Sequence, residues 1–80
     1  MKRSNDLRFG RGLKRLMERE EITIAEMEEW SGVSCSTISR TRLGVQTPHR
    51  GTMEALAAVF RMRAEEVIRA GEEEVSEAPG

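Results

Sequence analysis

The chain has 80 residues, 34% of them charged, and a net charge of −1, which suits one small domain with a modest core. A single cysteine excludes an intrachain disulfide, and one cysteine with one histidine argues against a Cys/His zinc site. No apolar run approaches the roughly 18 residues of a membrane span, and the start of the chain lacks a signal-peptide pattern. We therefore expect a cytoplasmic protein with no membrane partner.

The charges are distributed unevenly along the chain. Residues 1–50 hold ten Lys/Arg and seven Asp/Glu, whereas residues 51–80 hold three and seven. Between Glu29 and Glu54 there is no carboxylate, while this window contains three arginines: Arg40, Arg42 and Arg50. An anion such as a nucleic-acid backbone would meet no repulsion from acidic neighbours in this window, so the local pattern favours nucleic acid although the total charge does not.

The N-terminal part predicts a basic arm and a first helix. We expect residues 1–5 to form a short flexible arm and residues 6–20 to form a helix. Apolar side chains recur there at helical spacing: Phe9, Leu13, Leu16 and Met17. Gly10 and Gly12 weaken the first part of this helix, because glycine is a poor helix former.

Two short helices with a tight connection are predicted next. "TIAE", residues 23–26, has the spacing of a capping box and begins a second helix, which Gly32 ends. Ser34 is the expected N-cap of a third helix over about 34–43, with Gly44 as its stop. A connection of about three residues forces a sharp crossing, which is the geometry of a helix-turn-helix.

The rest of the chain predicts two more helices and a tail. After a loop that contains Pro48, we expect helices over about 52–60 and 64–70. Residues 71–80 are acidic and nearly devoid of large apolar groups, which is typical of disorder. The predicted fold class is all-α: a compact bundle of about five short helices, with the domain over 6–70.

The third helix has two different sides. At 100° per residue, four residues share one outward face: Cys35, Ser36, Ser39 and Arg40. Ile38 and Thr41 lie on another side, and Ile38 can reach the core. Serine can donate to or accept from any base edge, and arginine prefers guanine, so the outward face is suited to a DNA groove.

Phosphate contacts are predicted around this face. Ser34, at the positive end of the helix, could hold a phosphate with the free backbone amides. Arg42 and Arg50 could hold flanking phosphates, which give affinity and register but carry no sequence information.

The segment around the two predicted short helices resembles a known family. The motif T-x-x-E-M-x-x-x-S-G-V-S-x-S-T-I-S-R-x-x-x-G-x-x-x-P, residues 23–48, resembles the phage Cro and lambda-repressor type of helix-turn-helix, often called the Xre family. The resemblance covers about residues 9–70. It implies sequence-specific binding of double-stranded DNA, usually as a dimer on a palindromic or paired operator.

The resemblance also implies roles for single residues, with residues 34–43 as the recognition helix. Base-reading positions fall on Cys35, Ser36, Ser39 and Arg40. Positions on or near the DNA backbone fall on Ser34, Thr37, Arg42, His49 and Arg50. The chain departs from the family at Glu28, where a small alanine is common, and at Cys35, where arginine or glutamine is frequent.

These patterns predict a small transcriptional regulator, a repressor of phage or prophage type that occupies an operator. Two alternatives stay open: an antitoxin-like or adaptor protein-interaction module, and a recombination or excision accessory factor. A homodimer would form through the C-terminal helix region, either through the last helix with Val67 and Ile68 or through the region around Phe60 and Met62. We expect no enzyme activity, cofactor, metal or small-molecule ligand, because no catalytic triad or nucleotide-binding glycine motif is present.

Overall fold

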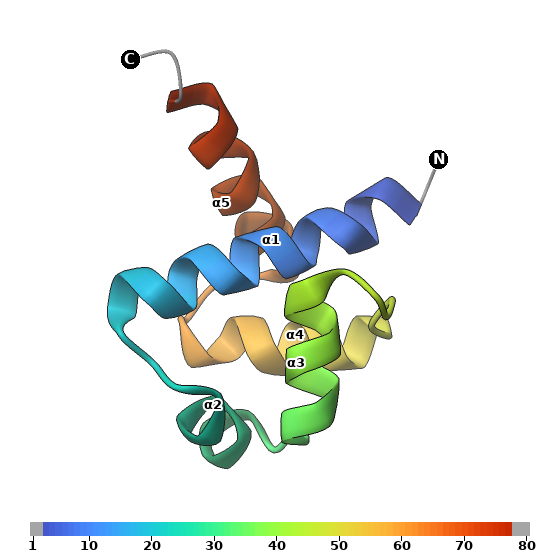
Figure 1. The fold of residues 1–80 in the computed structure, drawn as a ribbon, viewed down its shortest axis with the longest axis vertical. Coiled ribbons are helices and arrows are strands. Elements are labelled where there is room, and N and C mark those ends of the chain that lie inside the picture. The colour runs from blue at the N-terminus through green and yellow to red at the C-terminus, as the bar shows by residue number, and fades with distance from the viewer. Residues whose placement is uncertain (1–2, 78–80) are drawn as a thin grey trace.

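A computed structural model describes the backbone of residues 3–77 and the side chains of residues 8–72. Over this range the chain forms five helices and no strand (Figure 1). The helices are α1 (Arg3–Glu20), α2 (Ile24–Ser31), α3 (Cys35–Leu43), α4 (Arg50–Val59) and α5 (Ala64–Glu77). The expected all-α bundle is confirmed. No helix in the described part of the chain is long and apolar enough to cross a membrane.

Local capping fixes the helix-turn-helix formed by α2 and α3. The Thr23 hydroxyl accepts from the Glu26 amide at 3.1 Å, and the Glu26 carboxylate accepts from the Thr23 amide at 3.0 Å. This reciprocal pair is the predicted capping box. Gly32 ends α2 at φ 81°, in the left-handed region, and Ser34 then caps α3 by accepting from the Thr37 amide at 3.3 Å. Side-chain caps therefore set where α2 and α3 begin, and a left-handed glycine sets where α2 ends.

All five helices contribute to one core, in which α1 packs on α3, α4 and α5, and α2 packs on α3 and α4. The predicted apolar face of α1 is buried, and so are residues of every other helix. The buried apolar residues are Phe9, Leu13, Leu16, Met17, Met27, Ile38, Met53, Leu56, Ala57, Ala64, Val67 and Ala70. Since Val67 is 0% exposed, it cannot form part of a dimer surface, and the prediction that it might is wrong.

Three glycines allow α1 to approach its neighbours closely. A Cβ on Gly10 would lie 2.0 Å from the carbonyl oxygen of Thr41 in α3, and a Cβ on Gly12 would lie 1.8 Å from that of Val67 in α5. A Cβ on Gly71 would in turn lie 2.8 Å from the Gly12 nitrogen. The helix weakness predicted for Gly10 and Gly12 is thus offset by helix crossings that no larger residue would permit. Figure 1 shows α1 lying across α5.

The terminal helices extend beyond their predicted boundaries. α1 begins at Arg3 rather than at residue 6, and α5 continues to Glu77 rather than ending near residue 70. The reason at the C-terminal end is tertiary: Gly71 is buried against α1, and Glu72 Oε2 lies 2.6 Å from Arg8 Nη1. The helix ends expected at residues 6 and 70 are therefore corrected, whereas the division into arm, domain and tail stays a prediction. The flexibility expected of 1–5 and 71–80 stays a prediction, and residues 1–2 and 78–80 lie outside the described range.

Candidate nucleic-acid interface

The two sides of α3 are separated as the periodicity predicted. Ile38 and Thr41 are 0% and 1% exposed and face the core. On the opposite side Ser36 and Arg40 are exposed, and Cys35 and Ser39 are half-buried. These four outward residues line one open, shallow hollow together with Ile24 of α2. We call this surface, formed by Ile24, Cys35, Ser36, Ser39 and Arg40, the α3 face.

At the N-terminal end of α3 two hydroxyls are held in a fixed arrangement. The Ser34 hydroxyl donates to Thr37 Oγ1 at 3.0 Å and accepts from the Thr37 amide. Because Thr37 Oγ1 acts as an acceptor in this pair, its own proton is available to an outside acceptor such as a phosphate oxygen. Ser34 is exposed and Thr37 is half-buried, so both hydroxyls are accessible beside the α3 face.

At the C-terminal end of α3 the structure brings in two cations that sequence reasoning missed. One hollow is lined by Lys14, Ser39, Arg42 and Leu43, and an adjoining hollow is lined by Arg11, Lys14, Arg42, Leu43 and Gly44. We call Arg11, Lys14 and Arg42 the basic ridge. Arg11 and Lys14 are exposed, three residues apart on α1, and lie next to α3 because Gly10 packs against Thr41. The sequence indicates that Arg11 and Lys14 share the polar side of a predicted helix. Only the crossing of α1 and α3 shows that they lie near Arg42.

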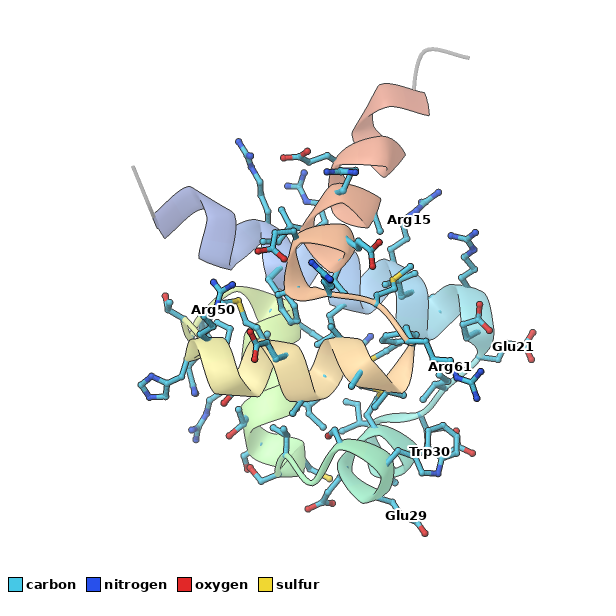
Figure 2. All side chains as sticks on the ribbon, turned by 180° about the vertical axis from the view of Figure 1, so that it is seen from behind. Arg15, Glu21, Glu29, Trp30, Arg50 and Arg61 are labelled. Atoms are coloured by element: carbon cyan, nitrogen blue, oxygen red, sulfur yellow. The ribbon has the colours of Figure 1, made fainter. Side chains whose placement is uncertain are left out.

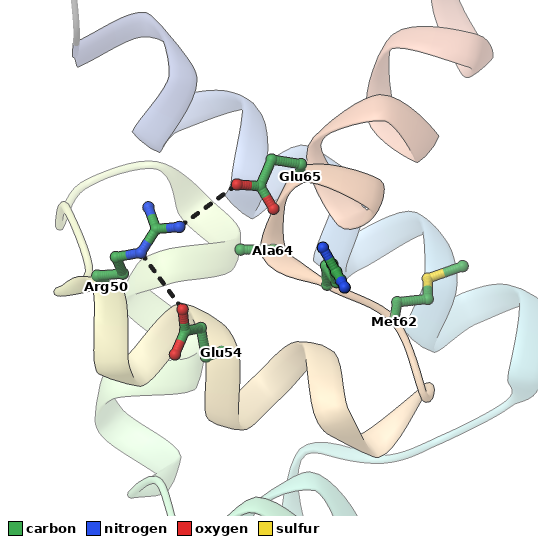
Figure 3. Close-up of a pocket in the computed structure, with 6 residues that line it drawn as sticks. Arg50, Glu54, Met62, Ala64 and Glu65 are labelled. Atoms are coloured by element: carbon green, nitrogen blue, oxygen red, sulfur yellow. Dashed lines mark hydrogen bonds and ion pairs between the residues drawn. The ribbon is translucent and has the colours of Figure 1, made fainter.

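Arg50, labelled in Figure 2, is the first residue of α4, and His49 is its N-cap; neither lines the hollow of the α3 face. Arg50 Nε is 3.3 Å from Glu54 Oε2, and Arg50 Nη2 donates to Glu65 Oε2 at 3.4 Å (Figure 3). A hydrogen bond from its own backbone amide, and then Arg50, hold the pKa of Glu65 below its usual value. His49 is the exposed N-cap of α4 and makes no side-chain cap bond. Arg50 is therefore engaged with two carboxylates in this structure.

One carboxylate reaches the edge of the α3 face. Glu28 lies one turn after Ile24 on α2, and its Oε1 accepts a hydrogen bond from Cys35 Sγ at 2.8 Å. This hydrogen bond, with some desolvation and the negative charge of Glu28, raises the pKa of the Cys35 thiol. The window between Glu29 and Glu54 is free of acids along the sequence, but the surface that it forms is bordered by an acid from α2.

The crossed pair α2 and α3, with the outward face of α3 left open, defines a helix-turn-helix protein. A sequence model described as "Helix-turn-helix domain" matches residues 8–70, and the chain belongs to this family.

Among curated proteins the chain is similar to the uncharacterized HTH-type transcriptional regulator RghRB of Bacillus subtilis (strain 168). The two are 34% identical over 77 aligned residues, which cover 88% of this chain and 55% of the relative. The chain thus spans about half the length of that relative. No solved structure matches the chain significantly.

Proposed function

We propose that this chain is a transcriptional regulator that binds double-stranded DNA by inserting α3 into the major groove. The observation that carries the proposal is the α3 face itself, an open surface of short polar side chains and one arginine next to a basic ridge. Its membership of the helix-turn-helix family and its similarity to a protein named as a transcriptional regulator support this function.

In this proposal the α3 face reads bases. The short side chains of Cys35, Ser36 and Ser39 allow the helix backbone to approach the groove floor, and serine hydroxyls can pair with any base edge. Arg40, the exposed last residue of the face along α3, has the length and the fork geometry to bind guanine O6 and N7 in a bidentate manner.

The two ends of α3 then hold the DNA backbone. Ser34 and Arg42 are eight residues apart, which is about 12 Å along a helix. The major groove is also about 12 Å wide, so hydroxyls at one end and cations at the other can contact phosphates on opposite sides of the groove. The basic ridge adds Arg11 and Lys14 to the predicted contact Arg42. Such contacts fix the register in which the α3 face meets the bases.

Arg50 and His49 would contact phosphates beside α4. Arg50 has to exchange its carboxylate partners, Glu54 and Glu65, for a phosphate. Its guanidinium and both carboxylates are more than half exposed. Exposed ion pairs are screened by water and contribute little to stability, so this exchange costs little.

The finer part of the proposal concerns the type of regulator. We propose a repressor of phage or prophage type that acts as a homodimer on a palindromic or paired operator. Phe60, Met62 and Ile68 are half-buried apolar residues at the edge of the core, available to a dimer contact around the start of α5. Two copies would then read half-sites about one helical turn, ~34 Å, apart.

The experiment that tests the proposal starts from selection of bound sequences out of randomised duplexes, followed by titration at two salt concentrations. Arg40→Ala should relax the preference at one base position, with a loss of about 1–3 kcal/mol against the selected sequence. Lys14→Gln should weaken binding to all sequences alike and reduce the dependence of log affinity on log salt by about one.

Arg61→Gln is the matched control for the loss of one exposed positive charge. Arg61 lies in the connection between α4 and α5, in a hollow that includes no residue of α3. It should leave both the base preference and the salt dependence nearly unchanged. If the wild-type protein selects no sequence above the level of non-specific binding, the proposed function is wrong, and a protein-interaction module becomes the better explanation of the fold.

A further inference from the structure

Glu28 is the one carboxylate among the described side chains that makes a hydrogen bond to a residue of the α3 face. It follows Ile24 by one helical turn, and Ile24 itself lines the hollow of that face. Its Oε1 lies 2.8 Å from Cys35 Sγ, at the first residue of α3. The Glu28 side chain is exposed, so a groove that accommodates α3 would also meet this carboxylate.

The chemistry of a carboxylate restricts what it can meet in a major groove. An ionised carboxylate only accepts hydrogen bonds, and DNA phosphates repel it. Guanine presents the acceptors N7 and O6, and thymine presents the acceptor O4, so both bases are unfavourable partners. The amino groups of cytosine and adenine are donors, but adenine places its N7 acceptor beside the amino group. Cytosine N4 is therefore the best partner.

We propose that Glu28 is a specificity-determining residue of the DNA interface, which accepts a hydrogen bond from the N4 amino group of a cytosine in the operator. The inference rests on the proposed function. Cys35 acts as the positioning residue, because its S–H group directs the carboxylate toward the start of α3. That bond does not exhaust the carboxylate, since its two oxygens offer about four acceptor sites.

The position of this contact relative to Arg40 follows from helix geometry. Cys35, which holds the Glu28 carboxylate, and Arg40 are five residues apart, or about 7.5 Å along α3. Successive base pairs are about 3.4 Å apart, so the two contacts are separated by about two base pairs. The preferred sequence should thus contain a cytosine and a guanine at that separation.

The test compares Glu28→Gln with Glu29→Gln by selection from randomised duplexes and competitive titration of single-base variants. Glu29 is the matched control, because it is the next residue on α2, is exposed, and points away from the protein (Figure 2). Both variants remove one negative charge, but only Glu28→Gln removes it from the edge of the α3 face, so Glu28→Gln should strengthen non-specific binding more than Glu29→Gln does. The wild-type protein and Glu29→Gln should prefer cytosine at one position by about tenfold.

Glu28→Gln should change that preference to adenine, because an amide pairs with adenine N6 and N7 together. Glu28→Asp keeps the charge but shortens the side chain by one methylene, so it should lose the cytosine preference without gaining another. Melting curves followed by circular dichroism check that each variant is folded. If Glu28→Gln is not folded, the base preference of Glu28→Asp decides the test.

The outcomes separate this inference from the function on which it rests. If the wild type selects a sequence and both Glu28 variants select the same one, Glu28 only joins α2 to α3 and the inference is overturned while the proposed function stands. A change in melting temperature without a change in base preference has the same meaning. If the wild type selects no sequence at all, both the function and the inference fail.

Discussion

Replacing Gly12 by alanine should force α1 away from α5 and destabilise the whole fold. The added Cβ would lie 1.8 Å from the Val67 carbonyl oxygen and 2.8 Å from the Val67 carbonyl carbon, whereas ordinary contacts begin near 3.4 Å. The obstacle is backbone, so no side-chain rotation can relieve it. The two helices would have to separate by roughly 1.6 Å at their crossing.

Two opposing effects set the magnitude of the change. Overpacking a close crossing costs about 1–3 kcal/mol or more, and it also opens the surroundings of Val67, which is fully buried. Alanine in place of glycine within a helix stabilises the helix by about 1 kcal/mol. We expect a net loss of about 2 kcal/mol, which for a domain of this size corresponds to a fall in melting temperature of roughly 8–16 °C.

Thermal and urea unfolding, followed by the helical circular dichroism signal, measure this loss. Gly51→Ala is the control, since Gly51 lies in α4 and a Cβ there would have no atom within 4 Å. It should raise stability by up to about 1 kcal/mol. A Gly12→Ala protein that melts at or above the wild-type temperature, with Gly51→Ala behaving as expected, would refute the argument from close approach.

Two further predictions concern single side chains. The Thr41 hydroxyl is buried without a hydrogen-bond partner, so Thr41→Val should raise the free energy of unfolding by about 1 kcal/mol. Urea unfolding measures this change. A lower free energy of unfolding in the variant would show that the hydroxyl makes a hydrogen bond. The pKa of Glu65 is lowered by its own backbone amide and then by Arg50, so its ionised form stabilises the fold above about pH 4.5, and this contribution disappears as the pH falls through the lowered pKa. The stability difference between wild type and Glu65→Gln should therefore be largest near neutral pH and shrink in acid; an undiminished difference at low pH would contradict this.

The features that the sequence predicted well are local ones. Thr23 with Glu26, and Ser34 with Thr37, are caps that satisfy amides within the next three residues. Such bonds are made by the segment itself, so their spacing is enough to recognise them. The same holds for the separation of the two sides of α3, because helical periodicity follows from the backbone alone.

The features that the sequence did not predict depend on contacts between distant segments. Gly12 and Gly71 are poor helix formers, and the close crossing of α1 and α5 explains why both helices contain a glycine there. Likewise Lys14 lies beside Arg42 only because α1 crosses α3, and Glu28 borders the α3 face only because α2 folds against it. Lys14 and Glu28 thus add a cation and a carboxylate to the candidate interface that the sequence did not predict there.

The charge distribution of the folded chain explains how an acidic protein can present a surface to DNA. Glu65 and Glu72 of α5 are paired with Arg50 and Arg8. At physiological salt an exposed charge is screened beyond about 8 Å, so DNA near α3 responds to the local surface rather than to the net charge of −1. That surface is cationic along the basic ridge and acidic at Glu28. In the proposed interface this single acid would weaken binding to every duplex, and only a sequence that offers it a donor would compensate for this loss.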